Sequence, residues 1–374
     1  MATRRGFLKN LVDSAAGVFF VGCCLQNAGA QSQPRTAGRR QAMIGGRRVL
    51  TVDIHSHCYV DVSDLTEGHP ANVSGSKAPN PFQAPILSPT SVPARLEQMD
   101  QYGIDMQAVS IVPSYNYGAE RELAREIVSR QNEQIAKMCA AHPDRFVGLG
   151  TVAMQHPDLA AEQMTTAVKD LGMRGFEIGC SVNEEELSAL KFNPFWAKAQ
   201  ELEVLIFIHP AGVMGNERQL QGNGFLNNVI GHPLETTVAL SHLIFEGTLD
   251  RFPNVKICAA HGGGYLASYL GRSDRCAEAS ERCKPVQRRP SEYFRQQLYC
   301  DSIVFTAEGL RHLVAEVGSD HILLGTDFPF DVSSPHMGDS RAVDSVLGAP
   351  GLSAMDYEQI LGANAMKLLK IKHA

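Results

Sequence analysis

The stretch Thr51-Val52-Asp53-Ile54-His55-Ser56-His57 decides how the rest of the chain is interpreted. Val52 and Ile54 alternate with polar residues, which is typical of a buried strand. In a strand, residues two apart share a face, so His55 and His57 are expected to point the same way at its C-terminal end. Two converging imidazoles can bind a divalent metal. The alternative is that both are satisfied by hydrogen bonds in a polar turn.

Apolar runs with strand character recur along the chain, and helical segments lie between them. After strand one, the strand-like runs are 106–112, 146–152, 175–180, 204–208, 255–260, 298–302 and 322–326. The helical segments are 91–102, 120–141, 158–171, 184–202, 234–251 and 306–317, with a final helix over 353–370. This alternation predicts a parallel sheet covered by helices. Eight units favour an α/β fold of the (β/α)8 TIM-barrel type, with an inserted loop after strand one (58–90) and a C-terminal helix. A doubly wound open sheet is the alternative, but no Gly-rich nucleotide turn follows strand one.

Composition restricts the class of protein. The chain has 374 residues, of which 44% are hydrophobic and 20% charged, enough for one large α/β barrel or two ordinary domains, and the eight strand–helix units favour the barrel. No apolar run reaches about 18 residues, so no transmembrane span is predicted. A formal net charge of −6 gives no reason to expect nucleic-acid binding. We therefore assign residues 49–374 to a single barrel.

The N-terminus has the features of an export signal. Thr3-Arg4-Arg5-Gly6-Phe7-Leu8-Lys9 closely resembles the twin-arginine signature, an apolar segment follows, and Ala28-Gly29-Ala30 is typical of a cleavage site. Residues 1–30 are therefore predicted to be a twin-arginine signal peptide and 31–48 a disordered leader. The protein is expected to be periplasmic or exported, through the twin-arginine export machinery. Lipid attachment at Cys23 is a weaker alternative.

The cysteines that remain after this cleavage suggest neither a zinc knuckle nor a disulfide framework. They number seven, and no C-x-x-C motif occurs among them. Cys276 and Cys283 are seven residues apart, which in one straight helix is too far for a bond.

Potential ligands stand where four predicted strands end. Besides strand one, the run 204–208 ends in His209, 255–260 in His261 and 322–326 in Asp327. Barrel enzymes carry their chemistry at the C-terminal ends of the strands, so these side chains are expected to meet at one rim. Five histidines in helical or loop segments are expected to be structural: His142, His156, His232, His242 and His312.

These motifs resemble the amidohydrolase superfamily. More narrowly, they are similar to its amidohydrolase 2 branch, which includes 2-amino-3-carboxymuconate-6-semialdehyde decarboxylase and the resorcylate decarboxylases. The resemblance runs from about Thr51 to the C-terminus. Its most specific pieces are Asp53-Ile54-His55-Ser56-His57, Met99-Asp100 with Gly103-Ile104, Asn193-Pro194-Phe195-Trp196, Phe207-Ile208-His209-Pro210, His261-Gly262-Gly263-Gly264 and Leu324-Gly325-Thr326-Asp327-Phe328-Pro329.

The resemblance implies one divalent metal and a separate proton-transfer residue. The implied metal ligands are His55, His57, His209 and Asp327, and His261 would stand beside the metal to move protons. Strand four, 174–179, lacks the lysine that bridges two metals in binuclear members. Three imidazoles and one carboxylate suit zinc, and manganese also fits.

Two arginines match arginines of that branch, and the first of them matches one that binds the substrate carboxylate. They are Arg95, before strand two, and Arg272, eleven residues past His261. A planar guanidinium suits bidentate binding of a carboxylate, and the alternative for each is a surface salt bridge. The resemblance also implies a homodimer in which a neighbour's arginine completes the site.

The reaction favoured by the resemblance is metal-dependent, non-oxidative decarboxylation of an aromatic or enolic carboxylic acid. The first alternative is hydrolysis of an ester, lactone or amide, in which Asp327 would take the proton of a water. The second is a barrel that binds a metal or ligand without catalysis. The local motifs favour the decarboxylase.

Overall fold

We describe the fold from a computed structural model of the chain. It describes residues 38–70, 91–113, 115–211, 218–283, 286–330 and 338–372. They lie in one compact unit, Gly38–Ala374. The predicted signal peptide and most of the predicted inserted loop, 71–90, lie outside the described residues. Among the described helices, none combines the length and the apolar character that a membrane span requires.

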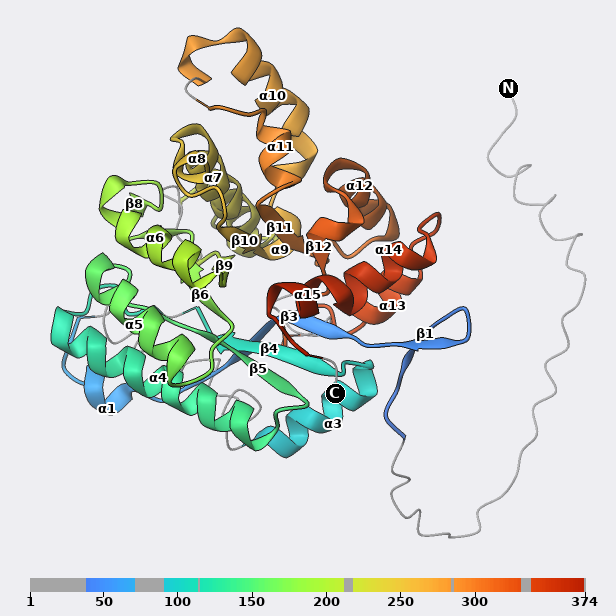
Figure 1. Ribbon diagram of the computed structural model, residues 1–374, viewed down its shortest axis with the longest axis horizontal. Helices are drawn as coiled ribbons and strands as arrows, with labels where there is room; N and C mark the ends of the chain where they lie inside the picture. The colour runs from blue at the N-terminus through green and yellow to red at the C-terminus, as the bar shows by residue number, and fades with distance from the viewer. Residues whose placement is uncertain are drawn as a thin grey trace, which may run out of the picture. The chain divides into compact units, whose positions relative to one another are not determined.

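Eight parallel strands form the central sheet, and the predicted (β/α)8 barrel is confirmed (Figure 1). The strands are β3 (Val52–Cys58), β4 (Met106–Ile111), β5 (Phe146–Gly150), β6 (Gly175–Gly179), β9 (Leu205–His209), β10 (Lys256–Ala259), β11 (Leu298–Asp301) and β12 (Ile322–Leu323). Each strand pairs with the next barrel strand along the chain.

A seam between β3 and the chain that follows β12 closes the barrel. The Ile54 N–H donates to the Leu324 carbonyl at 2.8 Å, and the Asp327 N–H donates to the His55 carbonyl at 2.9 Å. A single parallel bridge joins Ser56 to Phe328. The seam therefore places the two histidines of strand one beside Asp327.

Helices cover the outside of the barrel. The longer ones are α3 (Val92–Tyr102), α4 (Arg121–Ala141), α5 (Pro157–Lys169), α6 (Asn193–Leu202), α7 (His232–Phe245), α10 (Leu270–Ala279) and α12 (Ala307–Val317). The shorter ones are α1 (Ser63–Thr66), α8 (Thr248–Arg251), α9 (Ala260–Gly263), α11 (Pro290–Phe294), α13 (Ala342–Leu347), α14 (Ala354–Glu358) and α15 (Asn364–Leu368). Two antiparallel pairs lie outside the barrel, β1 (Ala42–Ile44) with β2 (Arg47–Val49), and β7 (Ser181–Val182) with β8 (Glu185–Glu186).

Two predicted helices differ from the observed ones. The helix predicted over 184–202 begins only at Asn193, because the β7–β8 turn places Asn183 and Glu184 at positive φ, outside the helical region. The final helix predicted over 353–370 is interrupted by a π-helical turn at Gln359–Ala363.

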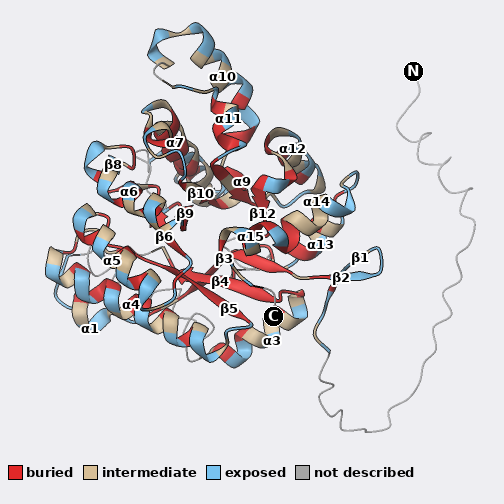
Figure 2. Cartoon of the chain, viewed as in Figure 1, coloured by how far each residue is buried: buried red, intermediate tan, exposed pale blue. Residues whose placement is uncertain are grey.

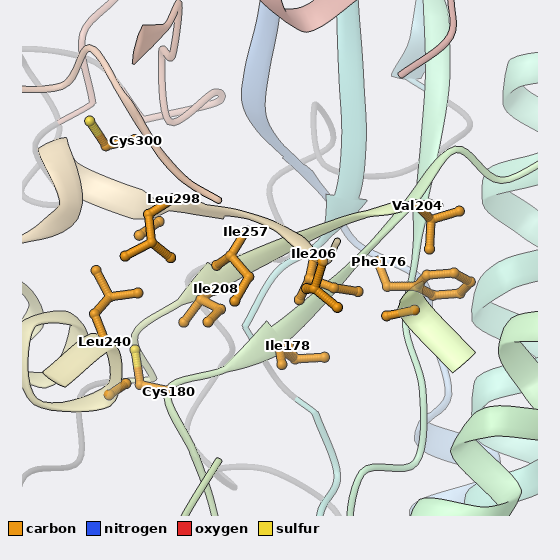
Figure 3. Packing of buried hydrophobic residues seen from close by; sticks show 14 of the residues in the cluster. Phe176, Ile178, Cys180, Val204, Ile206, Ile208, Leu240, Ile257, Leu298 and Cys300 are labelled. Atoms are coloured by element: carbon orange, nitrogen blue, oxygen red, sulfur yellow. The ribbon is translucent and has the colours of Figure 1, made fainter. Parts of the chain in front are cut away.

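The strands alternate between an inner and an outer core layer. On β9, Leu205 and Phe207 belong to the cluster inside the barrel, whereas Ile206 and Ile208 pack outward against the helices (Figure 3). The barrel strands are buried except at Lys256 and Tyr299, which are half-buried, while the covering helices carry exposed outer faces (Figure 2). His209 continues the inward series because residues two apart share a face. The core pattern thus aims His209 into the barrel.

The predicted disordered leader is folded from Gly38 onward. Arg39 and Arg48 reach the buried carboxylate of Asp105, at 2.9 and 2.8 Å. The N–H of Thr51 donates to the same carboxylate at 3.0 Å. These arginines bind the β1–β2 hairpin to the barrel, which composition alone did not indicate.

A disulfide joins Cys276 to Cys283, although the sequence suggested no bond between them. The assumption of one straight helix is wrong, because α10 ends at Ala279 and the chain turns back. The turn brings the two Cα atoms to 5.7 Å, within the range that a disulfide requires.

Candidate metal centre

An irregularity in β3 turns its two histidines into the barrel. The register with β4 shifts between Asp53 and Ser56, which is a bulge. Beyond the shift, the rings of His55 and Phe207 lie 4.9 Å apart inside the barrel, while Asp53 bonds to residues outside it. The side chains of His55 and His57 are fully buried.

Four of the predicted residues come together at the C-terminal rim. One ligand atom from each of His55, His57, His209 and Asp327 lies within 4.8 Å of the others. The Nε2 atoms of His55 and His57 are 3.1 Å apart, and Asp327 Oδ1 is 3.1 and 3.0 Å from them. All four residues are buried.

The hydrogen bonds behind the imidazoles fit a metal ion. Each Nδ1–H donates to a protein oxygen: His55 to Asp301 Oδ2 at 2.7 Å, His57 to the Ile111 carbonyl at 3.1 Å and His209 to the Pro210 carbonyl at 2.7 Å. This leaves the Nε2 of each ring facing the common point, and a neutral imidazole carries its lone pair there.

His209 supplies an independent test of that fit. Its buried Nε2 has no hydrogen-bond partner among the described residues. A buried polar atom without a partner is costly, and coordination would satisfy it. Burial, together with the neighbouring imidazoles of His55, His57 and His261, moves the pKa of His209 well below its ordinary value. His209 is therefore neutral and ready to bind a cation.

The site holds a negative charge that a cation would balance. Burial favours protonation of Asp327, but His55 and the hydrogen bonds from its neighbours outweigh it and place its pKa well below the ordinary value. Burial disfavours charging of His55, yet the carboxylates of Asp327 and Asp301 raise its pKa well above the ordinary value. A divalent cation would balance the charge of these carboxylates in place of a protonated His55.

Asp301, at the end of β11, is a residue of the site that our sequence analysis missed. One carboxylate oxygen accepts from His55 Nδ1 and from the His261 N–H at 2.9 Å, and the other from the Gly262 N–H at 2.8 Å. Asp301 thus orients a metal ligand and the His261 loop together. The strand-end rule that found the ligands could have found it, because Asp301 stands within the predicted strand 298–302.

Glu177, on β6, lies behind His57. Its carboxylate accepts from Ser110 Oγ at 2.5 Å and from Tyr115 Oη at 3.0 Å, and it stands 3.7 Å from His57 Nδ1. Burial raises its pKa above the ordinary value. Glu177 therefore supports the imidazole of His57 without belonging to the ligand cluster.

His261 lies beside the cluster and is not part of it. Its Nε2 is 3.6 Å from Asp327 Oδ2, the oxygen opposite to the one that faces the ligands. Its backbone is left-handed, with φ 57° and ψ 52°, a strained conformation that clusters at functional sites. The loop then packs directly against α7, because a Cβ on Gly264 would stand 2.2 Å from the Pro233 carbonyl.

His232, which the sequence analysis expected to be structural, lies next to His261. The two rings are 6.1 Å apart and nearly parallel. A π-helical turn, Asn227–Gly231, precedes His232 and places it at the start of α7. Such turns occur often at functional sites. The position of His232 could not be predicted from sequence spacing, because a π-helical turn contains one more residue than the α-helical turn that the periodicity assumes.

Arg95 does not face the ligand cluster. It is 2% exposed, and all three guanidinium nitrogens donate within the protein: Nε to Gln107 Oε1 at 2.8 Å, Nη1 to the His57 carbonyl at 2.6 Å and Nη2 to Ser56 Oγ at 2.9 Å. Its guanidinium also lies 4.5 Å from the Phe328 ring centroid. This placement argues against the predicted contact with a substrate carboxylate, because the guanidinium is buried and each of its three nitrogens already bonds within the protein.

Arg272 is exposed on α10 and is not brought to the cluster of its own chain. With the described residues it makes no hydrogen bond or ion pair. Among the described residues, nothing therefore ties Arg272 to the site that its sequence motif predicted.

Comparisons with known proteins agree with this geometry. A sequence profile of the amidohydrolase family matches residues 52–371. The chain is 31% identical over 278 residues to 2-amino-3-carboxymuconate-6-semialdehyde decarboxylase of Dictyostelium discoideum, which covers 74% of this chain and 75% of that protein.

Two solved structures are similar in fold. Dihydroxybenzoic acid decarboxylase of Polaromonas sp., with bound manganese and the inhibitor 2-nitroresorcinol, has a TM-score of 0.74 and 26% identity over 87% of this chain and 98% of that one. 5-Carboxyvanillate decarboxylase of Sphingomonas paucimobilis has a TM-score of 0.77 over 87% of this chain and all of that one. At 23% identity, this second likeness concerns the fold alone.

Proposed function

The chain belongs to the amidohydrolase family, and on this premise we propose that it is a metal-dependent, non-oxidative decarboxylase of an aromatic or enolic carboxylic acid. The observation that carries the proposal is the buried cluster of three Nε2 atoms and one carboxylate with His261 beside it. The named activities of the relatives support decarboxylation over hydrolysis of an ester, lactone or amide.

The residues divide the chemistry between them. A bound divalent metal supplies Lewis acidity, which stabilises negative charge on a substrate oxygen while the carbon–carbon bond breaks. His261 Nε2 delivers a proton to the carbon that bears the carboxylate. As carbon dioxide leaves, the electron pair of the broken carbon–carbon bond stays with that carbon, which ends with a hydrogen in place of the carboxylate. Because the His261 side chain is 15% exposed, it can regain its proton from solvent.

We propose zinc as the native metal, with manganese as the alternative. Three histidine nitrogens and one carboxylate oxygen suit zinc, which accepts both ligand types. Manganese prefers oxygen ligands, but the Polaromonas relative was solved with it. Activity after reconstitution with each metal in turn separates the two.

We further propose that the protein is a homodimer in which Arg272 binds the substrate carboxylate of a neighbouring copy. We also propose that the twin-arginine machinery exports the protein to the periplasm. The exposed position of Arg272, on a helix outside its own site, supports a role between copies. The arginine pair at positions 4 and 5 supports export. Fractionation of producing cells tests the location.

The test of the function is a screen of hydroxybenzoates, muconate-type acids and lactones in which carbon dioxide is measured. We expect one equivalent of carbon dioxide for each equivalent of acid consumed, and the reaction should not require molecular oxygen. The metal-depleted chain should release no carbon dioxide. Acid release from lactones without carbon dioxide would instead support the hydrolase. Turnover that persists in His261→Ala would overturn the role of His261.

A further inference from the structure

A buried carboxylate lies across the barrel seam, directly behind the metal ligands. Asp53 Oδ2 accepts from Thr326 Oγ1 at 2.6 Å and from Gln107 Nε2 at 3.0 Å. Its other oxygen accepts from the N–H of Thr326 at 3.0 Å and from that of His55 at 3.1 Å. Asp53 thus bonds to the backbone of a ligand, His55, on one side of the seam and to Thr326, the residue before Asp327, on the other, and it is fully buried.

The chain of bonds continues from Asp53 to helix α3. Gln107 accepts from Arg95 through Oε1 while it donates to Asp53 through Nε2. Arg95 then donates to the carbonyl of His57 and to Ser56 Oγ. The bonds therefore return to β3, the strand on which they began.

This stretch of the seam needs side-chain support. β12 contains only two residues, Ile322 and Leu323, and beyond it β3 is joined to the chain by separate backbone bonds at Leu324, Asp327 and Phe328 instead of a regular ladder. β3 is irregular here, because its register shifts between Asp53 and Ser56. The ligands must nevertheless converge within 4.8 Å from opposite sides of the seam.

We propose that Arg95, Gln107, Asp53 and Thr326 are positioning residues, a seam latch that holds His55 and His57 at the correct distance from Asp327 for metal binding. The latch acts on the metal ligands and rests on the proposed metal site, not on decarboxylation. Since residues behind the ligands typically change metal affinity ~10–100-fold when substituted, the latch should act on affinity to that extent.

The chain offers a matched control at the opposite end of the barrel. Gln297, immediately before β11, is as buried as Gln107, and it accepts from Arg288 Nη2 at 3.0 Å. It also donates through Nε2 to the carbonyls of Leu249 and Phe252, at 3.1 and 3.0 Å. Gln297→Met therefore breaks a comparable arginine–glutamine pair far from the ligands.

The experiment measures zinc affinity of the full-length chain by chelator competition, with thermal unfolding in parallel. We expect Gln107→Met to weaken zinc binding ~10–100-fold relative to Gln297→Met, at a similar loss of thermal stability. The visible spectrum of the cobalt-substituted chain should change in Gln107→Met only. Equal affinities in the two variants would overturn the proposal.

A gentler pair covers the case in which Gln107→Met does not fold. Thr326→Val keeps the shape of the side chain but removes its hydroxyl, whereas Thr326→Ser keeps the hydroxyl. Weakened zinc binding in Thr326→Val that Thr326→Ser restores would support the latch, and unchanged binding in both would refute it. Zinc affinity is read without substrate, so failure to find a decarboxylated acid leaves this test intact.

Discussion

Single residues in this site are held by what they bond to behind the metal. Asp327 uses one oxygen toward His55 and His57 and the other toward His261. Its φ of 57° is left-handed, as is that of His261. Strain at two neighbouring site residues is stable only where the surroundings fix the backbone, and Asp301 does so for the His261 loop.

Replacement of Asp301 by asparagine should weaken metal binding. The amide replaces one accepting oxygen with a donor, so either His55 or the loop N–H groups lose a partner. We expect zinc affinity to fall ~10–100-fold while the fold is kept. Chelator competition measures the affinity, and an unchanged value would show that Asp301 is not needed to orient His55.

Replacement of His261 by glutamine should separate binding from catalysis. His261 is outside the ligand cluster, so metal content should stay at the wild-type value. Loss of the proton donor should lower kcat ~10²–10⁴-fold. Metal analysis and carbon dioxide release from the same preparation check both. Loss of the metal in this variant would instead make His261 a ligand.

At the scale of elements, strand periodicity carried most of what could be predicted. Alternation on β9 aims His209 inward, but on β3 the register shift after Asp53 is also needed to turn His55 and His57 inward. The role of Arg95 could not be predicted in this way, because it depends on which face of β3 its helix covers. The β7–β8 hairpin was missed because its three consecutive glutamates favour a helix locally, whereas the observed turn needs positive φ.

The N-terminal hairpin should stabilise the barrel through Asp105. Removal of this buried partner in Asp105→Ala leaves Arg39 and Arg48 without their carboxylate. Solvent can take up the charge of these partly exposed arginines, so the main loss is the acceptor of the buried Thr51 N–H, and we expect the free energy of unfolding to fall by about 1–3 kcal/mol. Urea denaturation checks the value.

An exposed ion pair provides the comparison for that variant. Arg40 pairs with Asp344 on α13, where both side chains are well exposed. Asp344→Ala should cost only ~0–1 kcal/mol, because solvent screens the pair. If the two variants were equally stable, the hairpin would contribute nothing through Asp105.

At the scale of the whole molecule, the metal ligands come from the first and fifth strands of one closed barrel and from the chain that follows its eighth strand. A bound cation therefore ties β3, β9 and the chain after β12 together. Because it binds only the folded state, removal of the metal should lower thermal stability, by about 4 kcal/mol if free metal was at 1,000 times its dissociation constant. Calorimetry before and after chelation measures the loss, which should reverse on adding zinc.

Dimer formation with a shared arginine can be tested by mixing two inactive variants. In mixed dimers of Arg272→Ala and His261→Ala, one of the two sites has both residues intact. Random exchange of subunits should restore roughly a quarter of wild-type activity, as symmetric dimers require. No recovery, despite proven exchange, would place the Arg272 contribution within its own chain or remove it.

The central claim is that one divalent ion is held by His55, His57, His209 and Asp327. Mass-spectrometric metal analysis of the purified wild-type chain and of His209→Ala tests it most directly. We predict one equivalent per wild-type chain and little retained in the variant. Two equivalents in the wild type, or equal metal in both proteins, would contradict it.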